Sequence, residues 1–136
     1  GDTDIWFLRS VNFGDYWTSP LNVHNDELGT HQYAPWMAVD QSSGYVYVIY
    51  FSQQERESNL TDVYVAYSTD SGNSFKNARI NQLSFTPVAT ATPATFASIS
   101  VHKGIVAAAW TTSDQAGTVV WACSLKHDEL EKITMK

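Results

Sequence analysis

Continuous apolar runs dominate the strands that this chain is expected to form. Residues 45–51 read YVYVIYF and residues 63–67 read VYVAY, so neither run offers a polar face to water. A strand of this kind is covered on both sides by neighbouring layers. No stretch keeps the 3.6-residue period that crossover helices of a buried parallel sheet would need. The pattern therefore predicts antiparallel strands joined by turns, such as DQSSG at residues 40–44 and VHKG at residues 101–104.

An internal repeat links the N-terminal part of the chain to its centre. The segment DIWFLRSVNFGDYW at residues 4–17 aligns without a gap with DVYVAYSTDSGNSF at residues 62–75, 58 positions later. A second pair, GYVYVIYF from Gly44 and GIVAAAWT from Gly104, lies 60 positions apart. Periods of this length, built from short strands, are typical of propeller blades or a related array.

The expected fold is all-β, with antiparallel four-stranded propeller blades in an incomplete ring. Residues 1–25 supply the last two strands of one blade, residues 26–82 a complete blade, and residues 83–136 a further blade with a weakly supported outer strand. The expected strands are residues 4–10, 18–23, 33–40, 45–51, 62–68, 78–82, 96–101, 105–111, 118–124 and, for that outer strand, 132–135. This is about two and a half blades, whereas a closed ring needs about four. The remaining blades are expected from the same parent chain or from other copies.

Composition narrows the classes of partner. The chain of 136 residues has 8 basic and 14 acidic residues, a net charge of -6 and no Lys/Arg cluster, which argues against nucleic acid. Its apolar runs fall far short of the ~20 residues of a membrane helix, so no membrane insertion is expected. Cys123 is the only cysteine, which excludes an internal disulfide, and its apolar neighbours predict a small buried side chain. A start at Gly1 without Met is expected of a processed, cleaved or trimmed product.

The segment STDSGNSF at residues 68–75 resembles the Asp-box, or bacterial neuraminidase repeat, whose pattern is Ser/Thr-x-Asp-x-Gly-x-Ser/Thr-Trp/Phe. SVNFGDYW at residues 10–17 is a weaker copy, and the resemblance to secreted bacterial sialidase-like propellers spans residues 4 to about 121. It implies a turn between the third and fourth strands of a blade, away from the central pocket. The residues that match the box are Ser68, Asp70, Gly72, Ser74 and Phe75, with Ser10, Asn12, Gly14 and Trp17 in the weaker copy.

The chemistry of the box favours a structural role for Asp70. Its carboxylate is expected to accept N–H bonds from the turn, Gly72 to supply a positive φ, and Phe75 to tuck between sheets. Asn12 keeps an acceptor without a charge at the equivalent position, which fits a turn better than catalysis. A calcium loop is disfavoured because a cage of 6 to 8 oxygens needs more carboxylates.

The resemblance places ligand sites at the mouth of the central channel, on loops that enter first strands or join second to third strands. Those loops are residues 24–32, 52–60, 83–95 and 112–117. Their candidate ligand-binding residues are His24, Asp26, Glu27, His31, Glu55, Arg56, Glu57 and Asp114. The spacing of the histidines and acids matches no metal motif, so neither a metal nor a cofactor is predicted. Sugar-stacking candidates on strands, which packing explains better, are Tyr33, Trp36, Tyr50 and Trp110.

A sialidase mechanism, as the resemblance implies, needs an arginine triad, a tyrosine nucleophile assisted by a glutamate, and an aspartic acid as proton donor. Arg9 and Arg79 are expected near box turns at the rim, which leaves Arg56 as the one well-placed arginine. The catalytic residues are therefore not identified.

Three functions stay open. The first is a segment of a secreted or surface sialidase-like propeller that binds glycan or protein without catalysis. The second is part of an exo-α-sialidase whose other catalytic residues lie outside this chain. The third is a scaffold propeller closed by oligomerisation.

Overall fold

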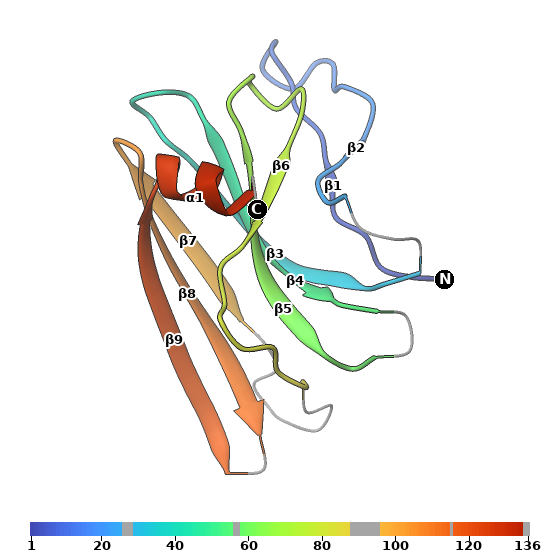
Figure 1. The fold of residues 1–136 in the computed structure, drawn as a ribbon. Coiled ribbons are helices and arrows are strands. Elements are labelled where there is room, and N and C mark those ends of the chain that lie inside the picture. The colour runs from blue at the N-terminus through green and yellow to red at the C-terminus, as the bar shows by residue number, and fades with distance from the viewer. Residues whose placement is uncertain (26–28, 56–57, 88–95, 115, 135–136) are drawn as a thin grey trace.

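The computed structural model describes residues 1–25, 29–55, 58–87, 96–114 and 116–134, and it contains three antiparallel sheets beside one another (Figure 1). The first pairs β1 (Trp6–Phe7) with β2 (Leu21–Asn22). The middle sheet has the order β3 (Gln32–Val39), β4 (Val46–Gln53), β5 (Thr61–Ser68) and β6 (Lys76–Arg79). The third contains β7 (Ala97–His102), β8 (Ile105–Asp114) and β9 (Gly117–Lys126), and the helix α1 (His127–Thr134) follows it. The all-β expectation is confirmed at this level, with three open sheets.

The two central strands of the middle sheet, β4 and β5, are buried on both faces, as their continuous apolar runs predict. Alternate side chains of β4 belong to two different hydrophobic clusters, one shared with the β7–β9 sheet and one shared with the β1–β2 sheet. The first side carries Tyr47, Ile49 and Phe51, and the second carries Val46, Val48 and Tyr50. The exposed fraction of each of these six residues is 8% or less. A strand without a polar face is therefore stable here because another sheet lies on each side of it.

The buried Asp40 joins the middle sheet to the third. It directly follows β3, and its carboxylate accepts hydrogen bonds from the Ser42 hydroxyl at 2.7 Å and from Ser42 N at 2.9 Å within its own turn. It also accepts Gly104 N at 2.7 Å and Lys103 N at 3.2 Å, which belong to the turn between β7 and β8. Hydrogen bonds from Ser42 and from the turn between β7 and β8 hold the pKa of Asp40 well below its usual range. One carboxylate therefore orders two hairpin turns at once.

The outer strand expected at residues 132–135 is wrong, because α1 occupies residues 127–134. Asp128 and Glu129 lie in its first turn, where acids are favourable, and the Glu129 carboxylate accepts Lys126 N at 2.6 Å. Leu130 is fully buried in the cluster between the second and third sheets, and α1 contacts both β6 and β9. The helix lies where the chain leaves β9 (Figure 1). Among the described residues, no helix is long and apolar enough to cross a membrane.

The other strands are found where the pattern places them, but several bounds differ. The expected strand at residues 78–82 is instead β6 at Lys76–Arg79, because the side chain of Asn81 takes over the pairing by accepting Val63 N at 2.8 Å. The first two strands shorten to two residues each. They are extended by single backbone bonds, from Val23 N to Ile5 O at 3.1 Å and from Thr18 N to Arg9 O at 2.9 Å.

Replacing Leu130 tests the packing of α1. Leu130→Ala is expected to lower the free energy of unfolding by about 2–5 kcal/mol, because it opens a cavity in the core. Lys132→Ala, at a side chain that is 73% exposed on the same helix, is the matched control and should change stability by less than about 0.5 kcal/mol. Urea unfolding of both variants measures the difference. Equal effects would contradict the packed helix.

Candidate functional site

The turn at residues 68–75, here the second turn, is closed by the side chains of Ser68 and Asp70. The Ser68 hydroxyl donates to Asp70 Oδ1 at 2.7 Å and accepts Gly72 N at 2.8 Å. Asp70 Oδ1 also accepts Ser74 N at 2.9 Å and Asn73 N at 3.0 Å, and its Oδ2 accepts the Ser74 hydroxyl. Hydrogen bonds from Ser74 and Ser68 hold the pKa of Asp70 well below its usual range. The carboxylate thus stays ionised while it organises the turn.

The turn at residues 10–17, here the first turn, repeats this geometry without a charge. The Ser10 hydroxyl donates to Asn12 Oδ1 at 2.9 Å and accepts Gly14 N at 2.8 Å. Asn12 Oδ1 accepts Tyr16 N at 3.0 Å, as Asp70 accepts Ser74 N in the second turn. An amide oxygen therefore accepts the backbone bond equivalent to that from Ser74 N, and an ionised group is not required for this turn.

Position 72 requires glycine because of its backbone conformation and because of its close contact with β1. Its φ is +79°, and a Cβ at this position would lie 2.5 Å from the ring of Phe7. That ring packs edge-on against Phe75, with centroids 5.1 Å apart, so Phe75 lies between the first and middle sheets. Gly14 has a φ of +93° with nothing within 4 Å of the equivalent atom. The first turn thus needs glycine for its backbone alone, whereas the second turn needs it for close approach as well.

Arg9 connects the two turns. Its guanidinium donates to the backbone oxygen of Ser71 and to the side-chain oxygen of Asn73. Both partners belong to the second turn, whereas Arg9 directly precedes the first. Arg9 therefore lies near the turns, as expected, and acts there as a structural link.

Arg79 lies at the end of β6 far from the second turn, so the prediction that it lies near a box turn is wrong. It pairs with the buried carboxylate of Asp62, at 3.0 Å, at the other end of β5. Asp62 also accepts Asn81 Nδ2 at 2.9 Å and Gln54 Nε2 at 2.7 Å. In the repeat, Asp62 aligns with Asp4, which lies 3.3 Å from His24 Nε2. Because β6 runs away from the second turn, its last residue reaches the strand ends that carry the predicted ligand loops.

Several of those loops border an open cavity of about 410 Å³, here the entrance cavity. Its lining comes from the N-terminal segment, the start of β3, the loop between β4 and β5, and the segment after β6. The described lining residues are Thr3, His31, Tyr33, Gln53, Asn59, Thr61 and Pro87. His31 Nδ1 lies 3.2 Å from Thr3 N and 3.1 Å from Thr3 Oγ1, and His31 N donates to Gln53 Oε1 at 3.2 Å. The cavity thus offers hydrogen-bonding groups whose arrangement is held by bonds among Thr3, His31 and Gln53.

Of the other predicted site residues, His24 is turned toward Asp4, and Glu55 is exposed in the loop after β4. Asp26, Glu27, Arg56 and Glu57 lie outside the described residues, and of Asp114 only the backbone, in β8, is described. Within the described part of the chain, no group of three potential metal ligands occurs.

The aromatic candidates separate into packed and exposed residues. Tyr50 and Trp110 are buried, and Tyr33 stacks on Phe51 with centroids 5.5 Å apart, so all three serve packing as expected. Trp36 is 56% exposed on β3. Packing against the described residues therefore does not account for Trp36.

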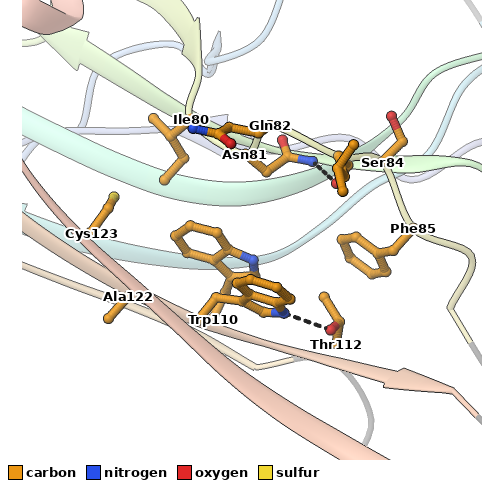
Figure 2. Close-up of a pocket in the computed structure, with 11 residues that line it drawn as sticks. Ile80, Asn81, Gln82, Ser84, Phe85, Trp110, Thr112, Ala122 and Cys123 are labelled. Carbon is orange, nitrogen blue, oxygen red and sulfur yellow. Dashed lines mark hydrogen bonds between the residues drawn. The ribbon is translucent and has the colours of Figure 1, made fainter.

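A second cavity, here the inter-sheet cleft, has a volume of about 430 Å³. One wall is the segment at residues 80–85 that follows β6, and the other is formed by β8 and β9. Figure 2 shows Ile80 and Gln82 above Trp110 and Cys123 in that view. Cys123, expected to be buried, is only half-buried, because β9 is an edge strand among the described residues and leaves this wall open. Sequence reasoning missed the cleft, since its two walls come from different parts of the chain.

No protein-family model matches the chain, and no curated protein matches it either. The described residues define a structural class: three antiparallel sheets, two serine-closed turns at one end of the middle sheet, and a cavity with several hydrogen-bonding side chains at its other end.

The two glycines allow a matched test of the turns. Gly14→Ala is expected to lower the free energy of unfolding by about 1–2 kcal/mol, the cost of the left-handed backbone alone. Gly72→Ala adds the clash with Phe7 and should cost about 2–5 kcal/mol. Urea denaturation compares the two. A Gly72→Ala variant no less stable than Gly14→Ala would exclude the close approach of Phe7.

The ionised Asp70 predicts a pH-dependent stability. Its folded pKa lies below its ordinary value of 3.8, so its contribution is present above about pH 4 and is lost as the pH falls through the folded pKa. Asp70→Asn should therefore be less stable than the unmodified protein at pH 7, with the gap narrowing toward pH 2. Asn12→Asp is the reciprocal variant and should gain acid-sensitive stability. Unfolding curves at several pH values measure both, and a gap independent of pH would refute the assignment.

Proposed function

We propose that the chain is a segment of a secreted or surface sialidase-like β-propeller that binds glycan without cleaving it. The proposal rests on the resemblance of both turns to the Asp-box and on the entrance cavity. Secretion and the association with further blades follow from the same resemblance and are part of the proposal.

The observation that carries the binding role is the lining of the entrance cavity. The amide of Asn59 carries donors and an acceptor, as sugar hydroxyls require, and the Gln53 amide beside it is held in place by His31 N and the Ser58 carbonyl. Tyr33 adds an aromatic ring, which suits a site that is partly apolar. Apart from His31, the described lining consists of side chains without a charge, and an uncharged sugar is the ligand proposed.

Catalysis is disfavoured by the places of the arginines. Arg9 is bound to the second turn and Arg79 to Asp62, so neither of these two is turned toward the entrance cavity. A triad that clamps a carboxylate would need such cations at the site. The proposed role is therefore recognition, with the neighbouring blades as structural partners.

Glycan binding is tested with the intact chain on a glycan array, followed by calorimetry with the best neutral ligand. Asn59→Ala should weaken binding about five- to tenfold, the loss of one hydrogen bond. Gln41→Ala, an exposed amide in the turn between β3 and β4, is the matched control and should leave binding unchanged.

Two results would contradict the proposal. Binding of no glycan at millimolar concentration would remove the glycan role. Turnover of a fluorogenic sialoside by the intact protein would establish the sialidase alternative in its place.

A further inference from the structure

We propose that the inter-sheet cleft is a binding site for an uncharged aromatic small molecule that stacks against Trp121. This site lies apart from the entrance cavity, and its inference is independent of the glycan proposal. The argument depends on the rigidity of the two walls, on their apolar surface and on their charge.

Both walls are fixed by hydrogen bonds. On one side, Asn81 accepts Val63 N at 2.8 Å and donates to Leu83 O at 2.8 Å, which holds the segment at residues 80–85 against β5. On the other side, the Trp121 indole N–H donates to Thr112 Oγ1 at 2.8 Å, which fixes the ring on the sheet. The Trp121–Thr112 bond is drawn in Figure 2. A volume of about 430 Å³ between such walls falls in the range of preformed small-molecule sites.

The exposed fraction of the apolar side chains that line the cleft increases from its floor to its mouth. Trp110, the partner of Trp121 across β8 and β9, is 7% exposed and forms the floor with Phe85 nearby (Figure 2). Trp121 is 49% exposed and Leu83 is 83% exposed, although both line the same cleft. Burying these two side chains under a flat ring would remove apolar surface from water, and an indole face favours offset stacking.

The charge of the walls selects a neutral ligand. The one ionisable side chain among the described lining residues is the Cys123 thiol, and burial raises its pKa, so it stays uncharged at neutral pH. The Arg79 guanidinium beside the cleft donates to Ser84 Oγ at 3.2 Å and is already paired with Asp62 at 3.0 Å, so a ligand charge would lose its hydration without gaining a new partner. The net charge of -6 further disfavours anions. At the rim, the Gln82 amide supplies a neutral hydrogen-bonding group for a polar substituent.

Two dyes with the same aromatic framework test the class of ligand. N-phenyl-1-naphthylamine is neutral, and 8-anilino-1-naphthalenesulfonate carries one negative charge on an equivalent framework. Fluorescence titration of the intact chain should give saturable binding of one neutral dye per chain, at least tenfold tighter than binding of the anionic dye.

Matched tryptophan variants locate the site. Trp121→Ala is expected to weaken binding of the neutral dye at least tenfold. Trp36→Ala, at a similarly exposed tryptophan on β3, should change it less than twofold. Leu83→Ala is the second variant in case Trp121→Ala unfolds. Leu83 is too exposed to support the fold, so this variant should remain folded. Its binding of the neutral dye should weaken about threefold.

Cys123, the single cysteine of the sequence, reports independently on where the dye binds. Intact mass spectrometry follows alkylation of Cys123 by N-ethylmaleimide with and without saturating neutral dye. Since Cys123 lines the cleft, dye in the cleft should slow the reaction at least fivefold.

Several outcomes would overturn the proposal. They are equal affinity for both dyes, equal losses in Trp121→Ala and Trp36→Ala, or an alkylation rate that the dye does not change. A second copy of the chain in the cleft would also overturn the proposal. In that case the protein forms a dimer that Trp121→Ala abolishes, and dye binding strengthens as the protein is diluted. None of these results depends on whether the entrance cavity binds a sugar.

Discussion

The burial of β4 on both faces is the constraint on which the rest of the structure depends. Tyr47 and Phe51 point into one cluster and Val48 and Tyr50 into the other. Full burial of each large apolar side chain contributes about 1.5–3 kcal/mol. Without its neighbours, the middle sheet would expose an apolar face of β4 on each side, so it requires a sheet on each side. The β1–β2 and β7–β9 sheets are those two covers.

Each cover is aligned by a charged side chain at the end of the strands, outside the apolar layers. Arg9 joins the first sheet to the second turn, and Asp40 joins the turn before β4 to residues 103 and 104. Hydrophobic burial is not directional, whereas these hydrogen bonds are. The apolar clusters therefore supply most of the association, and the polar links fix the register. This arrangement keeps the opposite strand ends available for the entrance cavity.

The sequence predicts features whose determinants are local. Ser68 and Gly72 lie within a few residues of their partners, so a spacing pattern was enough to predict the turn, and the continuous apolar runs predict the strands of the middle sheet. The helix was missed because Leu130 is buried by tertiary contacts that a short charged segment does not reveal. The ion pair of Arg79 and the walls of the inter-sheet cleft were missed for the same reason, since they depend on how separate elements pack. The sequence predicts the entrance cavity only as a group of loops. Of the candidate loop residues, His31 lies in the described lining, together with the sugar-stacking candidate Tyr33.

The shortness of β1 and β2 has a consequence for the dynamics of the chain. The first sheet has two paired residues in each strand and is fixed to the middle sheet by Arg9 and by the contact of Phe7 with Phe75. Elements with few ladder bonds open locally at a lower free energy than central strands do. The amide protons of β1 and β2 should therefore exchange with deuterium well before those of β4 and β5. The N-terminal segment is thus expected to open as a separate cooperative unit, and its detachment would expose the Val48 face of the molecule before global unfolding begins.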